Sequence, residues 1–246
     1  MRSQLLTNLQ LDELLKRFRR EDIVGPPYKV PELLKHSKVI ETQEAEMDAD
    51  GYTIPVNGYY IIGVNYKHSF YRKRFIYCHE LAHTLLIDLE TAGAIKKSSN
   101  QFDEEERLCN QIAVELLLPR NVFIRLAQKR KPSFSALHDL CKQFLVSFDV
   151  VRKRIIELDV WNVTMVSWQP MKAGNGNCPY SMKKIYGSGE GFMQSVRLSK
   201  QCIESINRTY TNDAHTVQPL GGSLVMESMR RKNMRGYYVL SLFAEQ

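Results

Sequence analysis

The chain lacks the features that would place it in a membrane or outside the cell. None of its apolar runs approaches the roughly 20 residues that a transmembrane helix needs. Residues 1–15 are too polar for a secretory signal, because glutamine, asparagine, aspartate and glutamate side chains interrupt the apolar ones. We therefore expect a cytoplasmic protein.

Paired cysteines are missing as well. The five cysteines are an odd number, and no two of them form a CxxC pair. This pattern excludes a disulfide framework and a zinc ribbon. Cys78 and Cys109 lie among apolar residues, so we expect both to be buried thiols.

Internal repeats and low-complexity tracts are also absent. The 246 residues are enough for one sizeable core and one or two smaller units. The net charge of +7 would attract acidic partners or nucleic acid. The positive charge is not concentrated in one segment, however, and an ordinary solvated basic surface is the alternative.

The spacing of apolar residues predicts an α+β fold. We expect an amphipathic helix over residues 8–20, followed by a stop at the Gly-Pro-Pro sequence that begins at Gly25. Strand patterns follow within residues 38–65, where Asn57-Gly58 between two apolar runs predicts a hairpin. The later elements that we expect are helices over residues 70–89 and 104–118, a helical pair over 133–158, strands over 163–168 and 237–243, and a helix over 194–207.

The strongest chemical signal is the segment His79-Glu80-Leu81-Ala82-His83. Histidines four residues apart on a helix share one face, so both imidazoles can reach one metal ion. Glu80 can hold a water molecule and take its proton, since a metal ion lowers the pKa of that water toward about 7. The surrounding apolar residues indicate a buried helix, where these polar side chains need partners. The alternative is a pair of ordinary histidines in the core or on the surface.

A catalytic zinc site needs a third protein ligand. The chain does not continue as HExxHxxGxxH, so this ligand must come from another segment. Glu106 and Asn110 share a face of the predicted second helix. Glu106 would supply a carboxylate, and Asn110 could accept the free N–H of a ligand histidine. Asp103 and Glu106 also fit a capping box, in which the neighbouring glutamates form a solvated acidic turn. The spacing alone leaves both interpretations open.

Two blocks of sequence resemble the ImmA/IrrE family of metallo-endopeptidases. Residues 72–83 are a basic and aromatic lead into the HExxH segment. Residues 106–119 contain the pattern ExxCN and a small-residue helix that ends in Leu-Leu-x-Pro. The strand over residues 61–65 is also similar to the family's strand. The resemblance covers about residues 30–160.

The resemblance implies a zinc-type metallo-endopeptidase with a gluzincin-like core of a small sheet plus helices. His79, His83 and Glu106 would be the metal ligands, and Glu80 the general base. Zinc is the expected metal, with manganese as an alternative because some relatives are described as manganese-dependent. The implied activity is cleavage of a helix-turn-helix transcriptional repressor, which derepresses stress-response or mobile-element genes. No membrane partner is expected.

We expect three parts: a metallopeptidase domain (1–125), a helix-turn-helix-like helical segment (126–160), and a C-terminal α+β domain (161–246) that is GAF-like or regulatory. The helical segment departs from the family pattern at Leu145, where a glycine is usual. Its basic residues at 152–154 would contact nucleic acid or the repressor, or they are solvated charges on a packing element. The alternative function is a non-proteolytic metal-binding regulator that binds DNA or a repressor through its basic helices.

Peptide hydrolysis also needs a donor to the oxyanion of the tetrahedral intermediate. Tyr66, His68, Tyr71 and His138 are candidates, and the sequence does not choose among them. An extended substrate segment could pair with a strand near the site, such as residues 59–64.

Overall fold

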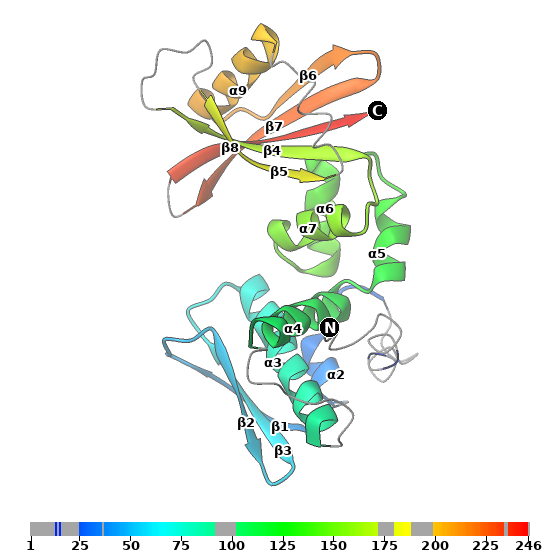
Figure 1. The fold of residues 1–246 in the computed structure, drawn as a ribbon, viewed down its shortest axis with the longest axis vertical. Coiled ribbons are helices and arrows are strands. Elements are labelled where there is room, and N and C mark those ends of the chain that lie inside the picture. Colours follow the sequence, from blue (N-terminus) through cyan, green and yellow to red (C-terminus); the bar gives the residue numbers. More distant parts are fainter. Residues whose placement is uncertain are drawn as a thin grey trace, which may run out of the picture. The chain divides into compact units, whose positions relative to one another are not determined.

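Two units, each built around its own β-sheet, make up the chain in the computed structural model (Figure 1). Unit 1 comprises residues 1–123 and 141–150, and unit 2 comprises residues 124–140 and 151–246. The structure describes Glu13, Leu15 and residues 25–35, 37–91, 102–171, 180–187, 199–233 and 236–245. The helix predicted over residues 8–20 therefore lies almost entirely outside the described residues. No helix among the described residues has the length and apolar character needed to cross a bilayer.

Unit 1 contains a three-stranded sheet in the order β1-β3-β2. Its strands are β1 (Val39–Ala45), β2 (Gly51–Val56) and β3 (Tyr59–Asn65). The central strand β3 pairs in parallel with β1 and antiparallel with β2. Asn57 and Gly58 form the turn between β2 and β3 with φ angles of 49° and 80°. Two positive φ angles are what a type I′ hairpin turn requires, so the predicted hairpin is confirmed.

Two long helices pack beside this sheet. They are α3 (Phe70–Thr91) and α4 (Phe102–Leu117), which confirm the helices predicted over residues 70–89 and 104–118. Helix α3 packs on β2 and β3, and α4 packs on α3 (Figure 1). Alternate residues of β3 point to the same face of the sheet, and Ile62 and Val64 are fully buried there. The short helix α2 (Val30–Lys35), which the sequence analysis did not predict, also contacts α3.

Three more helices follow α4. They are α5 (Arg120–Ala127), α6 (Phe134–Phe144) and α7 (Phe148–Glu157). The last two confirm the helical pair, whereas α5 was not predicted because Pro119 marked the end of a helix without marking the start of another. Leu145, between α6 and α7, has a φ of 52°, in the left-handed region that glycine tolerates best. Leu145 therefore adopts a backbone conformation that favours glycine.

Arg74 of α3 connects this turn to the rest of unit 1. Its Nε donates a hydrogen bond to the carbonyl oxygen of Leu145 at 3.0 Å, and its Nη2 donates to that of Tyr28 at 2.7 Å. The side chain is buried, and burial lowers the pKa of Arg74. A buried guanidinium needs such acceptors, so Arg74 is a structural residue of unit 1.

Unit 2 contains a five-stranded antiparallel sheet in the order β5-β4-β8-β7-β6. Its strands are β4 (Val163–Pro170), β5 (Tyr180–Gly187), β6 (Thr216–Gly221), β7 (Leu224–Asn233) and β8 (Gly236–Glu245). Helix α9 (Lys200–Asn212) packs on one face of the sheet (Figure 1). The helix predicted over residues 194–207 ends later than expected, at Asn212, and its first five residues lie outside the described ones. Only β4 and β8 were predicted among the strands.

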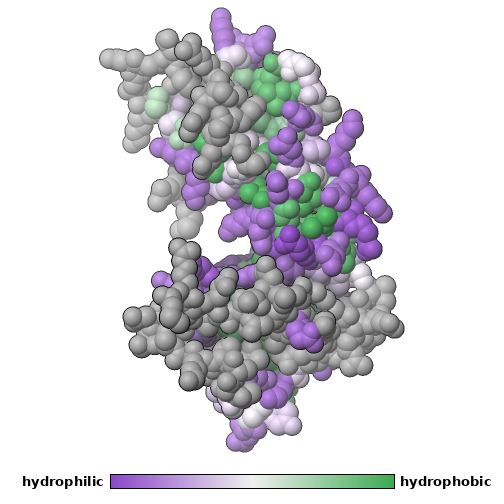
Figure 2. Space-filling view, turned by 45° about the vertical axis from the view of Figure 1, so that its right-hand side comes forward, coloured by the Kyte–Doolittle hydropathy of each residue, from purple (hydrophilic) through white to green (hydrophobic). Residues whose placement is uncertain are grey.

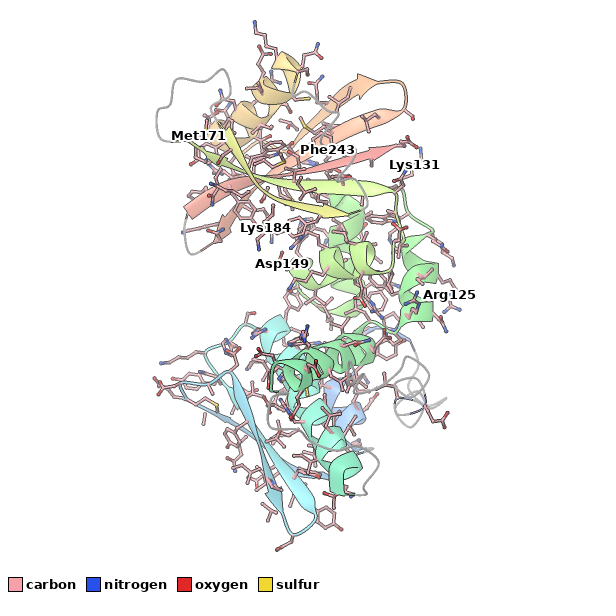
Figure 3. All side chains as sticks on the ribbon, in the orientation of Figure 1. Arg125, Lys131, Asp149, Met171, Lys184 and Phe243 are labelled. Carbon is pink, nitrogen blue, oxygen red and sulfur yellow. The ribbon has the colours of Figure 1, made fainter. Side chains whose placement is uncertain are left out.

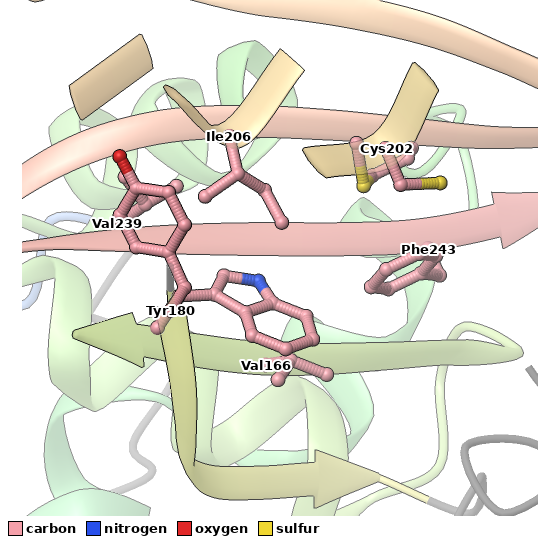
Figure 4. Close-up of a cluster of buried hydrophobic side chains, with 8 residues drawn as sticks. Val166, Tyr180, Cys202, Ile206, Val239 and Phe243 are labelled. Carbon is pink, nitrogen blue, oxygen red and sulfur yellow. The ribbon is translucent and has the colours of Figure 1, made fainter. Parts of the chain in front are cut away.

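The core of unit 2 lies between α9 and the sheet. Figure 4 shows its cluster of buried residues, which are Val166, Trp168, Tyr180, Cys202, Ile206, Met226, Val239 and Phe243. Trp168 is the largest of them, and its Nε1 donates a hydrogen bond to Ser241 Oγ at 3.0 Å. Because each unit combines a sheet with helices, the predicted α+β class is confirmed. On the face drawn in Figure 2, hydrophilic residues cover most of the coloured surface, and hydrophobic residues appear as patches between them.

Candidate metal centre

The HExxH segment lies in the middle of α3, and its four-residue spacing places both histidines on one face. The Nε2 atoms of His79 and His83 lie 3.2 Å apart. Glu106 of α4 reaches the same place, with Oε2 at 3.3 Å from His79 Nε2 and Oε1 at 3.3 Å from His83 Nε2. The structure thus brings together the three residues that the sequence analysis named as metal ligands.

The distances within this cluster fit a single shared metal ion. A tetrahedral ion with bonds of about 2.0–2.1 Å sets its ligand atoms about 3.3 Å apart. Imidazole nitrogen with carboxylate oxygen is a donor set that suits zinc and also manganese.

Glu106 does not occupy the position that the capping interpretation requires. Helix α4 begins at Phe102, so Asp103 is already helical and is not the residue that caps the helix. Glu106 lies in the second turn, and its carboxylate points toward the two histidines of α3.

Glu80 is held between α3 and the edge strand β2. It is 7% exposed, and Thr53 Oγ1 of β2 donates a hydrogen bond to Glu80 Oε2 at 2.8 Å. Burial raises the pKa of Glu80, and the hydrogen bond from Thr53 lowers it in part. A Cβ atom on Gly51 would lie 2.8 Å from Glu80 Oε1 and 2.6 Å from Ile76 Cγ2. Glycine at position 51 therefore leaves the space that the carboxylate fills.

Two further residues of α4 contact the back of the His83 ring. Glu105 Oε1 lies 3.3 Å from His83 Nδ1, and Cys109 Sγ lies 3.4 Å from the same atom. An acceptor at Nδ1 keeps the proton there and leaves the lone pair on Nε2. The sequence analysis considered Glu105 only as part of a solvated turn in the capping alternative, and it did not predict this contact. The available signal was the four-residue spacing of Glu105 and Cys109, which puts them on one face of α4.

Asn110 was expected to accept the free N–H of a ligand histidine. Burial lowers the pKa of His79, and the nearby Asn110 side chain opposes that effect. His79 Nδ1 itself is buried and has no hydrogen-bond partner among the residues that the structure describes. The role of Asn110 in setting the tautomer of His79 stays a prediction.

An open polar pocket of about 360 Å³ surrounds the cluster. Its described lining consists of Asp50, Gly51, Arg72, Phe75, Ile76, His79, Glu80, His83, Glu106 and Asn110. The four candidate oxyanion donors are not part of this lining, whereas Arg72 is. Arg72 forms an ion pair with Asp50, which lowers the pKa of that carboxyl. Asp50 Oδ1 also lies 2.6 Å from His68 Nε2, so His68 contacts a residue of the pocket lining without being part of it.

The strand predicted to pair with substrate is not the one that is accessible. Residues 59–64 belong to β3, which is hydrogen-bonded to β1 on one side and to β2 on the other. Its backbone groups are therefore used within the sheet, and the prediction is wrong. Among the described residues β2 pairs only with β3, which leaves its outer edge open beside Glu80.

Residues 37–155 match the model of a peptidase family. The matching model is described as the IrrE N-terminal-like domain, and the match covers just under half of the 246 residues of the chain. The predicted resemblance is confirmed, and the matched segment contains α3, α4 and the whole His-His-Glu cluster.

A solved structure described as a Mycobacterium tuberculosis transcriptional regulator is similar in fold, with a TM-score of 0.55. The similarity covers 96% of this chain and 74% of that chain at 16% sequence identity, and at this identity it shows the fold alone. No curated protein matches the sequence of the chain.

Proposed function

We propose that the chain is a zinc-type metallo-endopeptidase, with a gluzincin-like core, that acts in the cytoplasm. His79, His83 and Glu106 would hold the ion, as supported by their mutual distances of 3.2–3.3 Å. When bound, the ion lowers the pKa of a water molecule and polarises the scissile carbonyl group. The separation of these ligand atoms is the single observation that carries the proposal.

Glu80 is the general base. Its buried carboxylate lies beside the proposed metal ligands, where it can accept a proton from water and return that proton to the leaving amine. The hydrogen bond from Thr53 fixes Oε2 and leaves Oε1 to receive the proton.

Arg72 is the residue best placed to stabilise the negative charge that develops on the substrate carbonyl oxygen. It lines the pocket, and its ion pair with Asp50 orients the guanidinium. A guanidinium stays protonated throughout the working pH range of proteins, so it always donates hydrogen bonds. Preorganised donors of this kind stabilise oxyanions most effectively.

The outer edge of β2 would bind the substrate. An extended segment that adds to this edge runs beside Glu80, because Gly51 and Thr53 of β2 are both adjacent to that side chain. The substrate segment must therefore be able to become extended, as a linker or exposed loop can.

The substrate would be a helix-turn-helix transcriptional repressor, whose cleavage derepresses stress-response or mobile-element genes. The match of residues 37–155 to the IrrE N-terminal-like domain supports this assignment. The similarity in fold to a transcriptional regulator is compatible with a role in gene control.

The test is to incubate the chain with candidate repressors, with and without a chelator, and to compare wild type with Glu80→Gln. We expect fragments only with metal and only from wild type, while the variant keeps its bound metal as measured by mass spectrometry. Glu104→Gln serves as the matched control and should cleave normally. Proteolysis by Glu80→Gln would contradict the mechanism. A stoichiometric complex without fragments would instead favour the non-proteolytic regulator that binds DNA or a repressor.

A further inference from the structure

Unit 2 has a pocket of its own on the face of the sheet away from α9. Its volume is about 560 Å³, and its described lining consists of Ser167, Gln169, Lys183, Lys184, Tyr186, Asn233 and Tyr238. Along β4 these polar residues alternate with Val166 and Trp168, which lie in the core under α9. Figure 3 shows Lys184 projecting from β5 away from α9. The pocket is therefore separate from the hydrophobic core of unit 2.

A β-bulge brings two adjacent lysines to this pocket. Neighbouring side chains on a regular strand point to opposite faces. Here Ser167 pairs with Lys184 and Trp168 pairs with Met182, so Lys183 is an extra residue in β5. Bulges redirect side chains, and Lys183 lines the pocket together with Lys184. The irregular register thus concentrates positive charge at one place.

The charged residues in the described lining, Lys183 and Lys184, are both positive. No acidic residue is part of the lining that the structure describes. The guanidinium carbon of Arg152 lies 3.9 Å from the ring centroid of Tyr186, and Arg152 is 6% exposed. This cation–π contact holds the Tyr186 ring in place and adds a third positive charge beside it. The pocket is suited to an anion.

The remaining lining residues suit a planar ring. Tyr186 and Tyr238 supply aromatic surface, and the amides of Gln169 and Asn233 can each donate and accept hydrogen bonds at the edge of a heterocycle. The volume is larger than one phosphate group needs and falls within the range of about 300–1,000 Å³ that is typical of small-molecule sites.

We infer that unit 2 binds a small phosphorylated ligand of nucleotide size. Lys183 and Lys184 bind its phosphate, and the tyrosines and amides bind its planar ring. This site does not depend on the peptidase activity of unit 1.

Calorimetric titration of the full chain tests the inference. The probes are the common nucleoside mono- and diphosphates, the parent nucleosides and inorganic phosphate. At least one nucleotide should bind with a Kd of about 1 mM or tighter. Its nucleoside and inorganic phosphate should each bind at least about tenfold more weakly, because each makes only part of the contacts.

Variants locate the binding. Lys183→Ala combined with Lys184→Ala should weaken nucleotide binding by about tenfold or more, since both charge-assisted contacts are lost. The matched control, Lys200→Ala with Lys232→Ala, removes the same charge outside the pocket lining and should bind as wild type does. Tyr238→Leu should weaken the nucleotide but not inorganic phosphate. Thermal unfolding verifies that each variant is folded.

Three outcomes overturn the inference. The first is that no nucleotide binds at about 1 mM. The second is that inorganic phosphate binds as tightly as the best nucleotide. The third is that the control pair weakens binding as much as the pocket pair, which would indicate a general effect of charge.

Discussion

Thr53 Oγ1 lies 2.8 Å from Oε2 of Glu80 and thereby connects the edge strand β2 to the helix that carries the candidate metal ligands. The same hydroxyl lies 3.1 Å from the backbone carbonyl oxygen of Glu80. The strand proposed to receive the substrate therefore also holds Glu80, the proposed general base. Movement of β2 relative to α3 would displace both together.

Replacing Thr53 with valine removes this hydrogen bond at nearly constant volume. We expect the rate of cleavage of the proposed substrate to fall by about tenfold, the effect of losing one hydrogen bond to a charged group. Bound metal, measured by mass spectrometry, should not change. Thr53→Ser keeps the hydroxyl and should retain most of the activity. Wild-type rates in Thr53→Val would show that the contact does not orient Glu80.

The three adjacent glutamates of α4 should differ in their effect on metal affinity. Mutating a residue that only hydrogen-bonds to a metal ligand lowers metal affinity by roughly 10–100-fold. Glu106→Gln should lower metal affinity by more than this, because it changes a proposed ligand. Glu105→Gln should fall within that range, because its carboxylate lies 3.3 Å from His83 Nδ1. Glu104→Gln should have no effect, since only the other two carboxylates contact the histidines in the structure as described. Competition with a chromogenic chelator measures all three, and equal losses at positions 104 and 105 would rule out the contact from Glu105.

The left-handed backbone at Leu145 predicts a difference between two small residues. Leu145→Gly and Leu145→Ala both remove the side chain, but only glycine adopts a φ of 52° without strain. We expect the free energy of unfolding of the glycine variant to exceed that of the alanine variant by about 1 kcal/mol. Urea titration measures the difference. An alanine variant as stable as the glycine variant would show that the turn is not strained.

Tyr60 makes the stability of the protein depend on pH in the alkaline range. Burial, together with a 2.8 Å hydrogen bond to Asp88, raises the pKa of Tyr60 to about 12. An unfolded tyrosine titrates near pH 10. Between these values the folded state keeps a proton that the unfolded state loses, so the free energy of unfolding falls as pH rises.

The matching variant is Tyr60→Phe. Its free energy of unfolding should fall less steeply between about pH 10 and 12, even if its value at neutral pH is lower. Tyr77, whose pKa is also raised to about 12, is present in both proteins, so the difference in slope isolates Tyr60. Parallel curves from urea titrations at several pH values would contradict the assignment.

The spacing of residues in the sequence was sufficient to predict those features that depend only on neighbouring residues. The hairpin at Asn57-Gly58, the two long helices and the common face of His79 and His83 follow from turn chemistry and helical periodicity alone. Strands β4 and β8 were predicted because β-branched and aromatic residues dominate them. Strands β5, β6 and β7 were not, since each mixes polar residues or a proline into its pattern and its pairing partners lie elsewhere in the chain.

Tertiary packing decided which side chains come together at each site. Thr53 contacts Glu80 across 27 residues of sequence, and nothing in the pattern of either segment indicates that contact. The bulge that brings Lys183 and Lys184 to one pocket exists only in the pairing of β5 with β4. Glu105 and Glu106 are identical side chains about 100° apart around one helix axis. The sequence does not distinguish these two carboxylates. The orientation of α4 against α3 places Glu106 beside the Nε2 atoms of both histidines and Glu105 beside Nδ1 of His83.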